Sequence, residues 1–213
     1  MDTDLRELLE SGIKECGCSA SIEKLEKLYD EITLFNPVYK LVAAEKEELV
    51  KRHILDCLAP SSIIREFIKD GDKGADLGSG SGLPGLVLAS EFPTVHFTLV
   101  ERMGRRAGFL RNTSALCHLK ENTEVLEKDL SEVKEVFDFV VFRAFRPLED
   151  IITDLKRITR GGSYVFIYKS SEENIEKEKK VAEKDFEYTT FDYSVPSLKA
   201  KRTLLILKRK ADE

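Results

Sequence analysis

The sequence predicts an α/β fold, a mostly parallel sheet covered by helices on both faces, with a helical segment before it. Up to about residue 70, apolar residues recur at spacings of three and four, which is typical of amphipathic helices. Beyond Gly71, short apolar runs alternate with helical stretches, an order that favours βαβ units. We therefore divide the chain into residues 1–70, an N-terminal helical extension, and residues 71–213, the α/β domain.

The N-terminal extension is expected to contain several helices. Two apolar helical faces are visible, made of Leu5, Leu8, Leu9 and Ile13 in the first and of Ile22, Leu25, Leu28, Tyr29 and Ile32 in the second. Asn36-Pro37 is expected to interrupt the second helix, because proline disfavours helical backbone in the residue before it. A further helical stretch is predicted from about Glu45 to Leu58. After Pro60, either Ser61 or Ser62 is a candidate N-cap for a short helix that ends near residue 71.

The α/β domain contains short apolar runs that we interpret as strands. The predicted strands are Lys73–Leu77, Val95–Glu101, Phe137–Ala144, Ser163–Tyr168, about Tyr188–Tyr193 and about Arg202–Lys208. The run at 137–144 is almost continuously apolar, as expected of a strand buried on both faces. The predicted helices are Arg102–His118, Leu148–Ile158 and about Glu172–Lys184. The last of these is densely charged and is expected to be solvated, and a Gly161-Gly162 turn is expected before the 163–168 strand.

The composition is that of a globular protein. The chain has 213 residues, of which 42% are hydrophobic, and a formal net charge of −5. No apolar run approaches the roughly 18–20 residues that span a bilayer, and the acidic N-terminus argues against a signal peptide. The four cysteines form no CxxC pair, which indicates reduced thiols, so we expect a cytoplasmic location. Binding of nucleic acid by such an acidic chain would require a local basic cluster.

The strongest local signal is the glycine-rich segment 76–85, Asp-Leu-Gly-Ser-Gly-Ser-Gly-Leu-Pro-Gly. Gly78, Gly80 and Gly82 follow a predicted strand, and glycine allows positive φ and a close approach of the backbone to a ligand. Glu101 ends the next predicted strand, where a carboxylate can accept hydrogen bonds from both hydroxyls of a ribose. These features predict a nucleotide-binding loop, and a glycine-rich turn without a ligand is the plainer alternative.

Two kinds of ligand suit this loop. Gly80, Gly82 and Gly85 satisfy literally the G-x-G-x-x-G spacing of dinucleotide-binding loops. Asp76, however, completes the D-x-G-x-G-x-G pattern typical of adenosylmethionine-dependent methyltransferases, and its charge suits a sulfonium and an amino group but would repel a pyrophosphate. Too little chain follows the nucleotide-binding half for the substrate domain of a usual dehydrogenase. We therefore expect a methyltransferase in preference to a nicotinamide oxidoreductase.

The same segment, with its Leu-Pro-Gly continuation, resembles the motif of the RsmG/GidB methyltransferases. Further segments agree with that family, namely His53-Ile-Leu-Asp56-Cys57-Leu58, Glu101 with Arg105-Arg106 and Phe109-Leu110, Arg143-Ala144-Phe145 with Pro147, and Tyr168-Lys169. The resemblance implies a Rossmann-like class I methyltransferase fold, with a mostly parallel seven-stranded sheet, helices on both faces and an N-terminal helical extension. It makes residues 71–213 the methyltransferase domain. It also implies methylation of N7 of a guanine in small-subunit (16S) ribosomal RNA, with S-adenosylmethionine as cofactor.

The resemblance assigns cofactor positions residue by residue. Gly78 and Leu83 fall on cofactor positions of the family's glycine loop, and segment 128–130 corresponds to the part that cradles the adenine. Arg143 falls on the family's arginine at the end of the fourth strand. Together with the loop pattern, this gives the expected cofactor-binding residues Asp76, Gly78, Gly80, Gly82, Leu83, Glu101, Lys128, Asp129, Leu130 and Arg143.

The implied reaction needs little of the protein beyond positioning. Guanine N7 carries a lone pair and no proton, so its attack on a sulfonium methyl needs no general base. The chain has neither an Asn/Asp-Pro-Pro-Tyr/Phe segment, which exocyclic amine methylation would suggest, nor a Pro-Cys pair for covalent pyrimidine chemistry. Proximity and electrostatics should therefore carry catalysis. Arg143 is the candidate catalytic residue, as a donor to the guanine or a phosphate or as an organiser of the methionine end of the cofactor, and a structural salt bridge is the alternative.

Two basic clusters are candidates for RNA contact. They are Arg102, Arg105, Arg106 and Arg111 in one and Lys199, Lys201, Arg202, Lys208, Arg209 and Lys210 in the other. Read alone, each is typical of a solvated face. Lys169, at the end of a predicted strand, is a further candidate. Together with the resemblance, these clusters lead us to expect RNA binding by Arg105, Arg106, Lys169, Lys199, Lys201 and Arg202.

His53 and Cys57 lie one helical turn apart, which raises the question of a metal pair. No further ligand cluster accompanies them, so no metal site is expected. Packing, or a place in the wall of a pocket, is the preferred interpretation of His53 and Asp56.

Two alternatives to guanine-N7 methylation stay open. One is methyl transfer to another RNA or to a small molecule, and the other is a non-catalytic cofactor-binding factor for ribosome assembly. The expected partner is small-subunit ribosomal RNA or the small ribosomal subunit. Neither membrane binding nor metal binding is expected, and the protein is expected to be a monomer.

Overall fold

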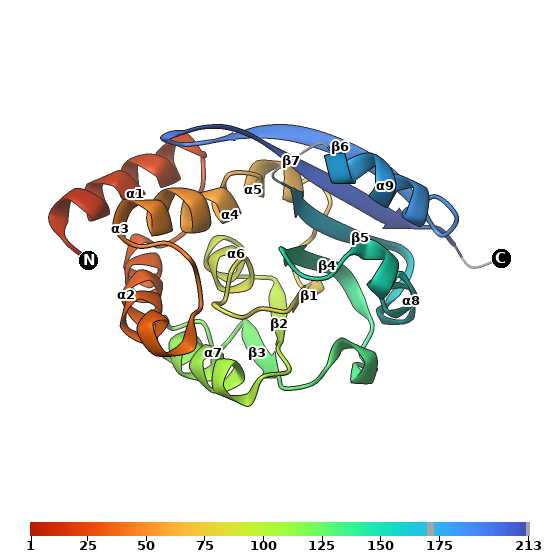
Figure 1. Ribbon diagram of the computed structural model, residues 1–213, viewed down its shortest axis with the longest axis horizontal. Helices are drawn as coiled ribbons and strands as arrows, with labels where there is room; N and C mark the ends of the chain where they lie inside the picture. Colours follow the sequence, from red (N-terminus) through yellow and green to blue (C-terminus); the bar gives the residue numbers. More distant parts are fainter. Residues whose placement is uncertain (170–172, 212–213) are drawn as a thin grey trace.

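The computed structural model describes residues 1–169 and 173–211, which form a seven-stranded sheet flanked by helices (Figure 1). The strands are β1 (Lys73–Leu77), β2 (His96–Val100), β3 (Thr123–Leu126), β4 (Phe137–Arg143), β5 (Thr159–Lys169), β6 (Phe186–Val195) and β7 (Leu198–Arg209). Their order in the sheet is β3-β2-β1-β4-β5-β7-β6. The pairs among β1 to β5 are parallel, whereas β7 runs antiparallel to both β5 and β6. The predicted mostly parallel sheet is confirmed.

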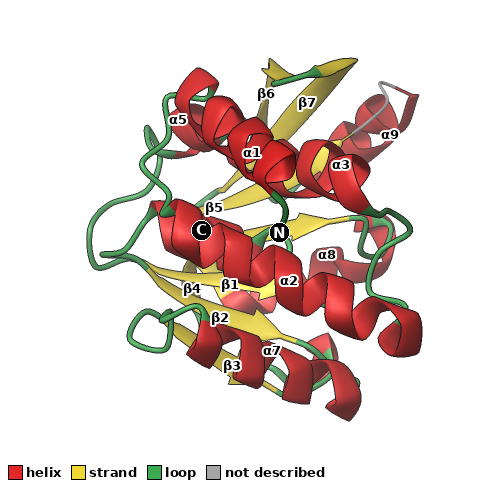
Figure 2. Cartoon of the chain, turned by 90° about the vertical axis from the view of Figure 1, so that its left-hand side faces the viewer, coloured by secondary structure: helices red, strands yellow, loops and turns green. Residues whose placement is uncertain are grey.

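The helices cover both faces of this sheet. In chain order they are α1 (Thr3–Glu15), α2 (Ile22–Tyr39), α3 (Lys46–Leu49), a π-helical turn (Val50–Leu55), α4 (Asp56–Leu58), α5 (Ser61–Ile64), α6 (Gly85–Glu91), α7 (Gly104–Leu116), a 3₁₀ turn (Leu130–Glu132), α8 (Leu148–Ile158) and α9 (Glu173–Ala182). Figure 2 shows α1, α2 and α7 together on one side of the strands. The apolar residues of α8 and α9 belong to the core on the other face.

The strand β4 shows why the central sheet is stable. Its side chains alternate between two cores: Phe139 and Val141 face the core under the N-terminal helices, and Val140 and Phe142 face the core under α8. All four are at most 2% exposed, so the strand is buried on both faces as its sequence predicts.

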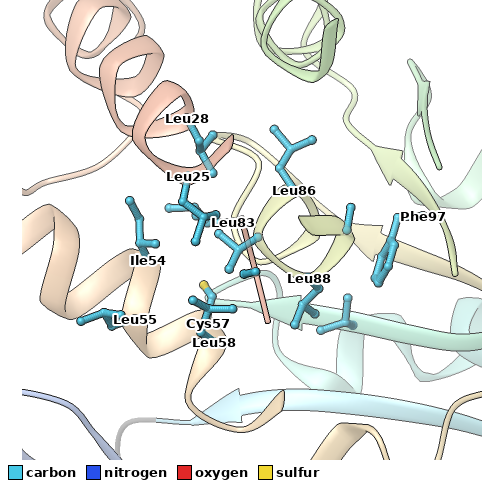
Figure 3. Close-up of a cluster of buried hydrophobic side chains, with 14 of the residues drawn as sticks. Leu25, Leu28, Ile54, Leu55, Cys57, Leu58, Leu83, Leu86, Leu88 and Phe97 are labelled. Atoms are coloured by element: carbon cyan, nitrogen blue, oxygen red, sulfur yellow. The ribbon is translucent and has the colours of Figure 1, made fainter. Parts of the chain in front are cut away.

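The N-terminal helices share a core with the sheet. Leu25 and Leu28 of α2 lie beside Leu86 of α6, and Ile54 and Leu58 pack in the same cluster (Figure 3). The extension therefore lies on the sheet as part of one packed unit, and it can contribute side chains to a site at the edge of the sheet.

Helix α2 continues through Pro37, contrary to the expected interruption at Asn36-Pro37. The proline stands in the last turn, where it removes one backbone hydrogen bond and only two helical residues follow it. The helix ends instead at Lys40, which adopts a left-handed conformation (φ 49°) and donates its N–H to the carbonyl of Asn36. The side-chain oxygen of Asn36 then accepts from the N–H of Val42 at 3.0 Å, which fixes the turn that follows.

The predicted N-cap at Ser61 or Ser62 is wrong. Helix α5 begins at Ser61 with Pro60 before it, and no side chain caps it. The predicted helix at 45–58 is also divided into α3, the π-helical turn and α4. Such a π-helical turn often marks a functional site, and here it carries His53.

In the sheet, β5 is longer than predicted. It begins at Thr159 and includes Gly161-Gly162, where the pairing with β4 shifts register, so the expected turn is an irregularity within the strand. The short strand β3 was not among the strands predicted from the apolar runs. The predicted start of the charged helix, Glu172, lies outside the described residues. The rest of that helix is not fully solvated, since Ile175, Glu178 and Ala182 of α9 are buried.

Candidate functional site

The candidate site lies where the parallel strands end. In open α/β sheets, ligands bind in the crevice beyond the carboxyl ends of the strands. Two cavities are found there. The first, here called the main cavity, has a volume of about 520 Å³ and is lined by the glycine loop, the end of β4 and the helical segment around His53. The second, the Glu101 cavity, has about 110 Å³ and lies between the ends of β1 and β2 and the 3₁₀ turn.

The glycine loop forms the border between the two cavities. Gly78 lines both of them, and Gly80 and Leu83 line the main cavity. Gly78 has φ +68°, and a Cβ added to it would lie 2.3 Å from the ring of Phe145. Both the backbone conformation and the close contact therefore require glycine at this position.

Glu101 is held at the entrance of its cavity by the backbone. Its two carboxylate oxygens accept hydrogen bonds from the N–H of Gly80 at 3.1 Å and of Met103 at 2.8 Å. The residue is only 5% exposed, and it lines the Glu101 cavity. Each carboxylate oxygen has a second lone pair, so the group can still accept from two ligand hydroxyls.

Asp76 lies behind the glycine loop, and the described residues that line the two cavities do not include it. Its Oδ2 accepts a hydrogen bond from the N–H of Gly85 at 3.0 Å, and its backbone carbonyl accepts from the hydroxyl of Ser79. Complete burial raises the pKa of Asp76 to about 7. In this geometry Asp76 supports the glycine loop, and the direct charge contact with a ligand that the sequence suggested stays a prediction.

The segment 128–130 lies in the wall of the Glu101 cavity. Asp129 caps the 3₁₀ turn, and its Oδ2 forms an ion pair with Arg146 at 2.7 Å. Hydrogen bonding from the N–H of Ser131, and then from Arg146, holds the pKa of Asp129 below its usual value. Leu130 is 2% exposed, so its packed side chain gives this cavity a rigid apolar wall against which a ligand ring could lie.

Arg143 lies at the end of β4 and is bound to the N-terminal extension. Its Nη1 donates to Oδ2 of Asp56 and to the carbonyl of Arg52, both at 3.0 Å. Its Nη2 is 2.8 Å from Nδ1 of His53. Asp56 also accepts from Nε of Arg202 at 2.9 Å, so one carboxylate joins two guanidinium groups. The side chains of Arg143, Asp56 and Arg202 are 17%, 7% and 15% exposed.

The protonation state of His53 follows from this contact. A guanidinium group can only donate, so Nδ1 of His53 is the acceptor and the proton of the neutral ring lies on Nε2. Burial, and then the charge of Arg143, lowers the pKa of His53 to about 4. His53 and Asp56 both line the main cavity, which is the pocket-wall position considered from the sequence.

The predicted RNA-binding residues fall into two groups. Arg106 and Arg202 line the main cavity, and Arg106 also lines the Glu101 cavity. Arg105 is exposed on α7, and Lys199 and Lys201 are exposed on β7. Lys169 also lines the main cavity; like Arg202 it is ion-paired, in its case with Glu178, and only 19% of its side chain is exposed. A phosphate would have to compete with that carboxylate for Lys169.

Some site residues were not found from the sequence. Tyr193 of β6 lines the main cavity, and its buried hydroxyl has no hydrogen-bond partner among residues 1–169 and 173–211. Arg146 faces the Glu101 cavity. Neither residue carries a sequence signal, because the long-range folding of β6 and the turn after β4 places them there.

In the described part of the chain, no group of three or more His, Cys, Asp or Glu side chains is placed to hold a metal ion. No helix in the described ranges is both long and apolar enough to cross a bilayer.

Solved structures with a similar fold are methyltransferases. A SAM-dependent O-methyltransferase from Thermotoga maritima superposes with a TM-score of 0.61 at 14% identity, covering 87% of this chain and 72% of that one. A tRNA methyltransferase from Aquifex aeolicus gives 0.60 at 10% identity, covering 74% and 69%. At such low identity the likeness establishes the fold alone, which is the Rossmann-like class I methyltransferase fold expected above.

Sequence comparison identifies the family. The model of the GidB family, described as rRNA small subunit methyltransferase G, matches residues 21–206. A ribosomal RNA small subunit methyltransferase G from Treponema denticola is 32% identical, and the match covers 98% of this chain and all of the relative. A relative of the same name, numbered 1, from Bdellovibrio bacteriovorus is 33% identical over 88% of this chain and 91% of its own. The chain therefore belongs to the rRNA small subunit methyltransferase G family.

Proposed function

We propose that this protein transfers a methyl group from S-adenosylmethionine to N7 of a guanine in small-subunit ribosomal RNA. The observation that carries the proposal is that the glycine loop joins the Glu101 cavity to a larger cavity lined by four arginines, in a chain of this family. The names of the relatives supply the substrate class, and the family resemblance supplies the N7 position.

The residues present fit S-adenosylmethionine. The lone pairs of Glu101 suit the two ribose hydroxyls, and the backbone of segment 128–130 borders the space for an adenine. Gly78, a position without room for a Cβ, lets the ligand pass from one cavity to the other. Gly80 and Leu83 would then border the methionine end, and Asp76 would hold the loop in shape. Gly82, also predicted to bind the cofactor, is not among the described residues that line either cavity, and a Cβ added to it would meet Leu86 and Leu110.

The chemistry requires positioning more than proton transfer. When bound, the cofactor supplies an electrophilic methyl group on a positively charged sulfur. The N7 lone pair would form the new N–C bond to that methyl group while the C–S electron pair would stay on sulfur, so the positive charge would pass to the purine. No proton moves, so the neutral His53 is not needed as a base. The protein contributes by holding N7 in line with the methyl carbon and sulfur.

Arg143 is best described as a positioning residue. Its donors are directed to Asp56, His53 and the carbonyl of Arg52, so it fixes the wall of the main cavity. Two guanidinium groups share the single carboxylate of Asp56, which leaves the wall with a net positive charge. Such a wall suits the phosphate of the target nucleotide. The exposed Arg105, Lys199 and Lys201 extend this charge to flanking RNA, together with Arg106.

The test uses small ribosomal subunits that lack the modification. They are incubated with the protein and methyl-labelled S-adenosylmethionine, and the RNA is digested and analysed by mass spectrometry. Label in 7-methylguanosine is the expected result. Label in another nucleoside would keep methyl transfer and overturn the N7 assignment. Binding of the cofactor without any label would favour a non-catalytic role in ribosome assembly.

A further inference from the structure

A third cavity lies beside the main cavity, on the side of α8 and α9. Its volume is about 320 Å³, and it lies between the ends of β4 and β5 and those two helices. Its walls include the rings of Phe142 and Phe145 and the aliphatic side chain of Ile167. Ala144, Tyr168 and Lys169 line both this cavity and the main cavity, so the two are neighbours across the ends of β4 and β5.

The cavity contains a carboxylate with unused hydrogen-bonding capacity. Glu178 of α9 lines it and is 8% exposed. One carboxylate oxygen is ion-paired with Nζ of Lys169. The other oxygen, Oε2, is buried and has no hydrogen-bond partner in the described residues. Burying a hydrogen-bond acceptor without a donor costs free energy. The unpaired Oε2 therefore indicates a ligand whose N–H groups donate to it.

A guanine base has the matching chemistry. Its Watson–Crick edge presents the N1–H and the N2 amino group side by side, two donors for one carboxylate. Adenine would bring its N1 lone pair against the same carboxylate, which is repulsive. N7 lies on the opposite side of the purine, so a guanine with its donors on Glu178 directs N7 away from that carboxylate, and the neighbouring main cavity is where the methyl donor would reach it. Enzymes that modify a base within RNA often extrude it into such a pocket between apolar and aromatic side chains.

We propose that Glu178 recognises the Watson–Crick edge of the target guanine in this third cavity. Lys169 holds the carboxylate in position and balances its charge, and Phe145 provides an aromatic surface for the base. This inference rests on the proposed function, because it assigns the place and the specificity of the same methyl transfer.

The experiment compares guanine with inosine at the target position. Inosine keeps N7 and N1–H but lacks the N2 amino group. Small subunits are reconstituted from RNA with either base at the modified position, and kcat/KM for methyl transfer is measured with the wild-type protein and with Glu178→Gln. The matched control is Glu176→Gln, which changes a carboxylate on the same helix that is 74% exposed.

The expected pattern is a coupling between the residue and the base. The wild type and the Glu176 variant should lose about 10- to 100-fold in kcat/KM when inosine replaces guanine, the discrimination typical of one base contact. Glu178→Gln should lose a similar factor on guanine, and the further loss on inosine should be small. The affinity for S-adenosylmethionine should stay unchanged.

Several outcomes would overturn the inference. If Glu178→Gln is only less stable, and keeps the wild-type ratio of guanine to inosine turnover, the carboxylate is merely a structural partner of Lys169. If that variant fails to fold, the wild-type ratio alone decides: equal turnover of guanine and inosine refutes recognition of the N2 amino group. If the wild type forms no 7-methylguanosine on the guanine substrate, the proposed function fails and the inference falls with it.

Discussion

Replacement of Asp56 by asparagine tests the most connected contact of the site. Its carboxylate is 7% exposed and accepts from Arg143 at 3.0 Å and from Arg202 at 2.9 Å. Breaking a buried ion pair by removing one partner costs about 3–5 kcal/mol, because a charge is left buried without compensation. Asparagine keeps the shape and one acceptor oxygen, so we expect a loss near the lower limit, about 3 kcal/mol. With a urea m-value of about 2 kcal/mol/M, the unfolding midpoint should fall by about 1.5 M.

The measurement is urea unfolding followed by circular dichroism, with Glu47→Gln as the matched control. Glu47 pairs with Lys51 one turn away on the surface, and its side chain is 65% exposed, so its loss should cost less than about 0.5 kcal/mol. A second variant, Asp56→Asn with Arg143→Met, removes one of the two cations as well, and should be less destabilised than the sum of the single changes. An effect of Asp56→Asn no larger than that of Glu47→Gln, or strict additivity in the double variant, would refute the reasoning.

Further predictions concern activity, pH and salt. Arg143→Ala should lower methyl transfer by more than about 100-fold while cofactor binding, measured by calorimetry, is retained; near-normal turnover would exclude Arg143 from the site. Asp76 has a folded-state pKa raised by burial to about 7, so its proton stabilises the fold at low pH, and that stability is lost as the pH rises from about 4 to 7. Urea unfolding at pH 5 and pH 8 should show this loss in the wild type and less of it in Asp76→Asn. Gly78→Ala should cost about 1–2 kcal/mol for its left-handed backbone, and should abolish cofactor binding because its Cβ meets Phe145; unchanged affinity would contradict this. Activity should fall steeply with added salt, and Lys199→Gln should reduce the slope of log activity against log salt by about 1; an unchanged slope would remove that lysine from the RNA contacts.

The parts of the fold that the sequence predicted best are those with an uninterrupted local pattern. The bounds of β1 and α8 agree with the predicted 73–77 and 148–158, and β4 ends one residue before the prediction. The strand β3 was missed because it is only four residues long and polar at Thr123 and Glu124. Its pairing with β2, where Phe97 lies opposite Thr123, decides its conformation, and no local pattern records that contact.

The candidate site was predictable where one loop provides it and not where distant segments meet. The spacing of the glycines located the loop, and Glu101 lies beside it because it directly follows β2. Asp56, in contrast, meets Arg143 and Arg202 from 87 and 146 positions away in the chain. Glu178 was hidden in a run of charges that reads as a solvated helix, since nothing local shows that Lys169 lies against it.

These long-range contacts give the N-terminal extension a chemical role in addition to its apolar packing. Without residues 52–56, Arg143 would lose its acceptors on Arg52, His53 and Asp56, and Arg202 would lose its carboxylate partner. Both guanidinium groups would then be free to turn toward any anion, including the carboxylate of the cofactor. The extension directs them to one wall of the main cavity, whose opposite border is the glycine loop. Under the proposed function, the methionine end of the cofactor and the target nucleotide would meet in this cavity, so the extension would fix the charge that both of them encounter.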